Sequence, residues 1–131
     1  MLSRTALTAL CVLAGPISAQ DVGMGREDYL HYCAACHGQD ATGDGPMTLA
    51  PMLPPPDLTE LSALNKGVFP IFDVIARIDG RDPLVAHGSP MPVYGDFFEG
   101  KGVTVRDENG ILVMTSQAIV DLVAYLQSIQ K

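Results

Sequence analysis

Residues 33–37 read CAACH, and this short stretch decides how the rest of the chain is interpreted. Two thiols separated by two residues and followed at once by an imidazole are typical of the covalent attachment of c-type haem. The thiols form thioethers with the two vinyl groups of the porphyrin, and a helical turn presents the imidazole to the iron. We therefore expect one haem c, attached to Cys33 and Cys36, with His37 as an iron ligand.

A zinc half-site and a redox-active disulfide are the other interpretations of two cysteines at this spacing. A structural zinc needs four ligands, and the chain offers only His31 and His87 besides His37, in no pattern that groups them. A thioredoxin-like disulfide is expected within a βαβ pattern, which the sequence around the cysteines lacks. Haem attachment is therefore the interpretation that the sequence favours.

Residues 1–19 have the features of a secretory signal peptide. Arg4 supplies the positive start, an apolar run covers residues 6–14, and the small Ala19 ends a plausible cleavage site. The apolar run is shorter than the roughly 20 residues that span a bilayer, so we expect cleavage rather than an uncleaved anchor. Cleavage removes Cys11 and places the protein in the periplasm, with no stable membrane insertion.

Residues 20–131 form the one expected domain, and its charge is strongly acidic. Once residues 1–19 are removed, seven basic and fifteen acidic side chains remain, a net charge of −8. The basic surface that nucleic-acid binding requires is missing. An acidic surface attracts a partner with a positive docking patch. The alternative is a solvated surface with no meaning for partner choice.

The hydrophobic patterns predict a mainly α-helical domain with one small β-hairpin. Asp57 and Pro70 are expected near the starts of two helices, Gly80 at the end of the second, and Ser116 at the start of the last. Helices are expected over residues 26–35, 57–64, 70–79 and from about 116 onward, strands over 103–105 and 111–113, loops over 39–56 and 81–100, and a frayed lead-in over 21–25.

The second axial ligand is expected in the loop over residues 81–100. Met91 lies between Pro90 and Pro92, which stiffen the backbone and let a thioether be held against iron at little cost in side-chain freedom. His87 is the rival, and it would give bis-histidine ligation with a lower potential than Met/His ligation. The methionines at positions 47, 52 and 114 are expected to fill the core.

A backbone carbonyl is expected to orient His37. A ligating histidine usually donates its other ring N–H to a carbonyl or a carboxylate. Pro46, nine residues further on, is the candidate acceptor, and its alternative role is that of a plain turn residue.

Together these features resemble the class I cytochrome c family in its small bacterial form. The attachment motif, Gly45-Pro46, the proline-flanked Met91 and an amphipathic C-terminal helix follow one another in the family's order, and the resemblance covers residues 23–131. It implies a cytochrome c fold of three to five helices around one haem, in which the first and last helices cross tightly. The residues that match this crossing are Gly25, Tyr29, Leu122 and Tyr125.

The resemblance implies one-electron transfer between larger redox proteins, as donor and acceptor, and not an enzyme. With His37 and Met91 both bound, the iron has no open position for a substrate. The alternatives are a haem enzyme or gas sensor with a displaceable sixth ligand, and a fixed haem subunit of a larger oxidoreductase complex. The hairpin over residues 103–114 departs from the simplest family pattern, and it is either a partner-docking element or a surface insertion.

Overall fold

The structure, a computed structural model, describes residues 19–47, 54–81, 91–95 and 98–131. It confirms a mainly helical fold with a two-stranded antiparallel sheet before the last helix. The elements in chain order are α1 (Val22–Asp28), the π-helical segment η1 (Tyr29–Cys33), α2 (Ala34–His37), the 3-10 segment η2 (Leu58–Glu60), α3 (Leu61–Leu64), α4 (Ile71–Asp79), β1 (Gly102–Arg106), β2 (Leu112–Ser116) and α5 (Gln117–Ser128).

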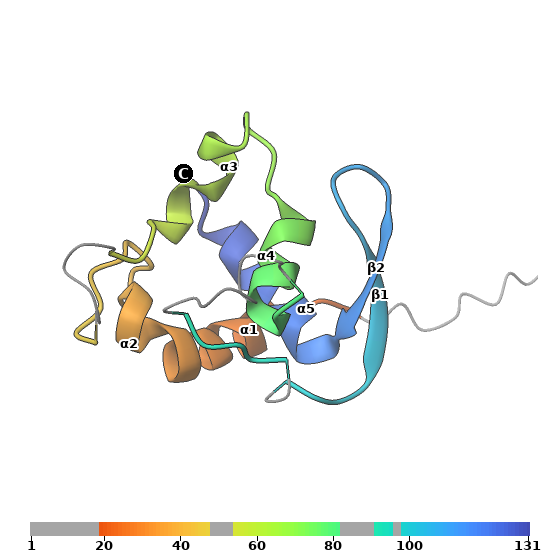
Figure 1. The fold of residues 1–131 in the computed structure, drawn as a ribbon, viewed down its shortest axis with the longest axis horizontal. Coiled ribbons are helices and arrows are strands. Elements are labelled where there is room, and N and C mark those ends of the chain that lie inside the picture. The colour runs from red at the N-terminus through yellow and green to blue at the C-terminus, as the bar shows by residue number, and fades with distance from the viewer. Residues whose placement is uncertain (1–18, 48–53, 82–90, 96–97) are drawn as a thin grey trace, which may run out of the picture.

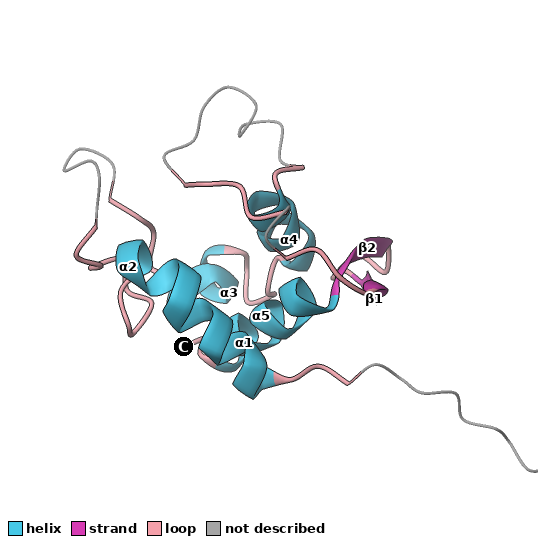
Figure 2. Ribbon diagram, turned by 90° about the horizontal axis from the view of Figure 1, so that it is seen from below, coloured by secondary structure: helices cyan, strands magenta, loops and turns pink. Residues whose placement is uncertain are grey.

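Helices α1 and α5 cross in direct backbone contact at Gly25 (Figures 1 and 2). A Cβ atom added to Gly25 would lie 1.9 Å from the carbonyl oxygen of Asp121, so any side chain would force the helices apart. One turn further along the chain, at the start of η1, the ring of Tyr29 lies 5.2 Å from that of Tyr125. The tight crossing implied by the resemblance is therefore present, and it involves the expected residues.

The start of α1 differs from the sequence prediction, which treated residues 21–25 as a frayed lead-in. The helix begins at Val22, because the Asp21 carboxylate accepts hydrogen bonds from the backbone N–H groups of Gly23 and Met24 at 2.9 and 3.1 Å. The N–H of Asp21 in turn donates to the buried carboxylate of Asp121 on α5, at 2.9 Å. A partner one hundred residues away thus orders the segment.

The boundaries of α4 and α5 follow local chemistry, as predicted. Pro70 precedes α4, and Gly80 ends it in the left-handed conformation, with φ of 84°, which glycine adopts without strain. Ser116 caps α5, because its side chain accepts a hydrogen bond from the N–H of Ile119. These ends could be recognised because each depends on a single residue type.

The predicted hairpin is also confirmed, with β1 and β2 slightly longer than expected. The Asp107 carboxylate holds its turn by accepting from the N–H groups of Asn109 and Ile111. Val105 lies opposite Val113, and both pack toward the core. The hairpin stands at one end of the molecule and α2 at the other (Figures 1 and 2).

We predict that Gly25→Ala destabilises the haem-loaded protein by about 3 kcal/mol, because overpacking at a backbone contact forces the helices apart. Chemical denaturation followed by circular dichroism measures the effect. Gly23→Ala is the matched control on the same helix, where an added Cβ meets only the flexible Asp21 side chain, at 3.2 Å. Equal stability of the two variants would show that the crossing is not a close contact.

Candidate haem-attachment site

The expected attachment residues lie on one continuous helical stretch that leads out of the crossing. Cys33 is the last residue of η1, and Cys36 and His37 close α2. Both thiols are half-buried and form no disulfide, and His37 is buried. These three residues therefore lie close together on one helical stretch.

A π-helical turn separates the crossing from the attachment residues. The N–H of Ala34 donates to the carbonyl of Tyr29, five residues back, where an α-helix would use the residue four back. A π turn holds one residue more than an α turn, and such turns occur frequently at functional sites. Tyr29, the first residue of this turn, packs on Tyr125, and Cys33 is its last residue.

The loop after α2 folds back and closes the C-terminal end of this helix. The N–H groups of residues 43, 45 and 47 donate to the carbonyls of His37, Cys36 and Ala35, at 2.8, 3.1 and 2.8 Å. The last carbonyls of a helix lack partners within it, so these bonds satisfy groups that would otherwise need water. The Tyr29 hydroxyl adds a buried bond of 2.7 Å to the carbonyl of Gly38.

The environment of His37 suits a neutral imidazole. Burial lowers its pKa, and a nearby backbone carbonyl, that of Pro56, opposes the shift. Its Nδ1 atom is buried, and no acceptor completes a hydrogen bond to it. A metal-ligating histidine must be unprotonated at the binding nitrogen, so the chemistry of this side chain fits an iron ligand.

The carbonyl expected behind His37 was assigned to Pro46, and the structure does not support that assignment. Pro46 is exposed, because its neighbours Gly45 and Met47 use their N–H groups to close the end of α2. The carbonyl that approaches the ring belongs to Pro56 instead. Pro56 lies just before Asp57, which caps η2. This position next to a helix start is the feature of the sequence that could have identified it.

The properties of Cys33 argue against a reactive dithiol. Burial raises the pKa of its thiol to about 12, with further contributions from Asp28 and Cys36. Catalytic and redox-active cysteines need a lowered pKa. Among the described residues, no group of three or more His, Cys, Asp or Glu side chains is arranged to hold a metal ion.

Met91 is partly buried and packs against the core. The described methionines at positions 24, 47 and 114 are at least half exposed, so the expectation that Met47 and Met114 fill the core is wrong. Met52 and the rival ligand His87 lie outside the described residues. Of the methionines that the structure describes, Met91 is thus the best placed to contact a group held inside the protein.

Tyr94 holds the segment 91–95 beside the attachment helix, and the sequence prediction missed it. Its hydroxyl donates to the carbonyl of Tyr32 at 3.1 Å, and its ring packs against those of Tyr32 and Phe98. Burial raises the pKa of Tyr94, and the proximity of Cys33 and Cys36 raises it further. The available signal was an aromatic residue three positions after Met91.

Comparison with known proteins gives one match. The family model described as Cytochrome c matches residues 24–130, which include every attachment and ligand candidate. No curated protein matches the chain significantly, and no solved structure does so either.

We predict that Gly45→Ala lowers the stability of the haem-loaded protein by about 2 kcal/mol, the usual scale of overpacking, and reduces its yield. An added Cβ would lie 2.4 Å from the carbonyl oxygen of Cys36 and would push the loop off α2. Haem absorbance per unit of purified protein and thermal denaturation measure the two effects. Gly100→Ala, where the added Cβ meets no atom within 4 Å, should match the wild type, and equal losses in both variants would contradict the assignment.

Proposed function

Since this chain belongs to the cytochrome c family and so carries covalently bound haem c, we propose that it is a periplasmic electron carrier whose haem iron is held by His37 and Met91. Haem c supplies a one-electron iron couple. Cys33 and Cys36 provide the thioether attachment. The family's general role as an electron carrier agrees with this assignment.

The observation that carries the proposal is the packing of Met91 against the core, in a segment tied to the attachment helix by Tyr94. If Met91 from that segment and the buried His37 both bound the iron, a haem held here would have no open position for a substrate. Met/His ligation also raises the potential of a haem. The protein's own task is then to hold two ligands, limit the access of water and present its surface to a partner.

The carbonyl of Pro56 is proposed to orient His37. A ligating imidazole is kept in one tautomer when its other N–H faces an acceptor, and this carbonyl already affects the ring. The buried hydrogen bond from Tyr29 to Gly38 supports the backbone just beyond His37.

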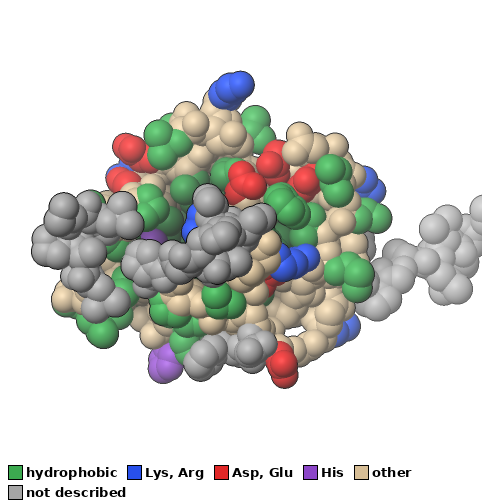
Figure 3. Space-filling view, in the orientation of Figure 1, with side chains coloured by type: hydrophobic (Ala, Val, Ile, Leu, Met, Phe, Trp, Pro, Cys, Tyr) green, Lys and Arg blue, Asp and Glu red, His purple; other side chains and the backbone are tan. Residues whose placement is uncertain are grey.

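Larger redox proteins with a basic docking patch are the proposed donor and acceptor. The acidic charge of residues 20–131 favours such partners, and acidic side chains gather in the upper part of one face, near α4 (Figure 3). Transient redox encounters use small, weak interfaces. Attraction between opposite charges raises the rate at which such encounters form.

Export to the periplasm is proposed from residues 1–19 as a signal peptide that is removed after Ala19. No helix among the described residues is long and apolar enough to cross a membrane. The domain that remains, residues 20–131, contains the whole attachment site.

We predict that Met91→Ala removes the weak red absorption band of the ferric, methionine-ligated protein and lets the ferrous protein bind carbon monoxide. The thioether is lost and the sixth position opens. Absorption spectroscopy of the purified variant measures both effects. Met24→Ala is the matched control, because Met24 is half exposed on α1.

An unchanged spectrum in Met91→Ala would contradict the assignment. Absence of the red band from the unaltered protein, with a gain of carbon monoxide binding in His87→Ala, would then identify the rival ligand. Ready carbon monoxide binding by the unaltered protein would instead favour a haem enzyme or gas sensor. A native mass larger than that of one chain would favour a fixed subunit of a complex.

We predict opposite salt dependences for electron transfer to two small oxidants of opposite charge. Because the protein is acidic, its reaction with cationic tris(1,10-phenanthroline)cobalt(III) should slow as ionic strength rises, while that with anionic ferricyanide should accelerate. Stopped-flow absorbance follows the oxidation of the ferrous protein. Rate constants that do not change with ionic strength for either oxidant would show that the net charge does not steer partners.

A further inference from the structure

The segment that contains Met91 is attached to the C-terminal end of α4. The N–H of Tyr94 donates to the carbonyl of Ile78 at 2.8 Å. A Cβ added to Gly80 would lie 2.4 Å from the Val93 side chain, and one added to Gly95 would lie 2.7 Å from the carbonyl oxygen of Asp79. The position of the segment 91–95 therefore follows the position of the end of α4.

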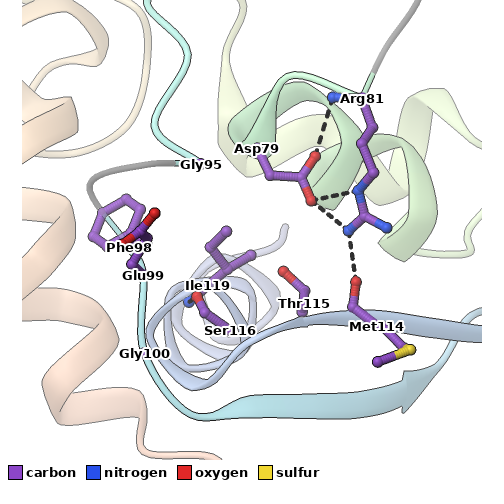
Figure 4. Close-up of a pocket in the computed structure, with 10 residues that line it drawn as sticks. All are labelled: Asp79, Arg81, Gly95, Phe98, Glu99, Gly100, Met114, Thr115, Ser116 and Ile119. Atoms are coloured by element: carbon purple, nitrogen blue, oxygen red, sulfur yellow. Dashed lines mark hydrogen bonds and ion pairs between the residues drawn. The ribbon is translucent and has the colours of Figure 1, made fainter.

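The hairpin holds this end of α4 through Arg81. The Arg81 guanidinium donates to the backbone carbonyl of Met114 on β2 at 2.7 Å, and it also pairs with the Asp79 carboxylate (Figure 4). The Asp79 carboxylate is nearly buried and fixes the guanidinium from the α4 side, while Arg81 itself is about half exposed. One side chain thus links the last turn of α4 to the hairpin.

The hairpin also holds the other end of α4, through Glu108 in its turn. The Glu108 carboxylate accepts a hydrogen bond from the N–H of Ile71, the first residue of α4, at 3.0 Å. The first N–H groups of a helix have no partner within it, and a negative charge is favourable at that end. The hairpin therefore contacts α4 with a polar group at each end.

Between these two links the packing is open. A hollow of about 690 Å³ lies between α4, the hairpin and α5, and residues such as Ile71, Val103, Val105 and Val120 line it. Close packing does not fill this space, so the two polar links carry much of the connection between hairpin and helix. The hairpin also stands far from α2 (Figures 1 and 2), which places it away from the attachment residues.

We propose that the β1–β2 hairpin clamps both ends of α4 and so positions the Met91 segment, with Arg81 and Glu108 as positioning residues. The inference rests on the proposed function, because it concerns Met91 as an iron ligand. When the Arg81 link or the Glu108 link is weakened, α4 can move relative to the hairpin. The segment 91–95, which is attached to the C-terminal end of α4, moves with it. The Met91 thioether would then compete less well against an added ligand for the iron.

The test is a titration of the haem-loaded ferric protein with imidazole, followed by loss of the weak red band. The variants are Arg81→Gln, Glu108→Gln and their combination, and both side chains lie in exposed positions, so the variants are expected to fold. Each single change should lower the apparent dissociation constant of imidazole about fivefold, which corresponds to the loss of one weak interaction. The double change should lower it further. Lys101→Gln and Glu60→Gln remove the same charges from exposed positions and should leave binding unchanged.

Imidazole affinity equal to that of the wild type in both clamp variants would overturn the inference, even if their unfolding free energies fall, because the links would then be structural only. Equal tightening in the charge-matched controls would overturn it as well. The proposed function fails in a different way: Met91→Ala would bind imidazole no more tightly than the wild type. That result would contradict the inference as well.

Discussion

The backbone contact between α1 and α5 at Gly25 is the constraint on which the rest of the structure depends. It sets how closely the first and last helices approach, and the aromatic pair Tyr29–Tyr125 continues that contact one turn further on. From there α1 passes without a break into the turns that carry Cys33 and His37. The other helix begins directly after the hairpin, and the N–H of Gln117 donates to Lys101 at the base of that hairpin.

The two candidate iron ligands, His37 and Met91, are thus positioned by different elements of the fold. His37 is placed through the first helix and is enclosed by a loop that satisfies the carbonyls at the end of α2. Met91 is placed through α4, with Tyr94 as a second link to the attachment helix. Burial lowers the pKa of His37, which favours the unprotonated imidazole that iron ligation needs. The two ligand candidates are thus supported by separate elements of the fold.

Sequence reasoning succeeded where one residue type decides a local structure, and it failed where the partner is distant. Gly80 and Ser116 mark helix ends through their own conformation or side chain, so both were predictable. The helix start at Asp21 depends on Asp121, one hundred residues away, and no local sequence pattern predicts this contact. The π turn and the choice of Pro56 over Pro46 likewise result from how the chain folds back on the attachment helix. The role of the hairpin was left open because its links to α4 join residues more than thirty positions apart.

Iron K-edge X-ray absorption of the ferric, haem-loaded protein tests the central claim most directly, because it reports the atoms bound to the metal. The account predicts one sulfur ligand from Met91 together with nitrogen ligands from the porphyrin and His37. A first coordination shell of nitrogen or oxygen alone would contradict it.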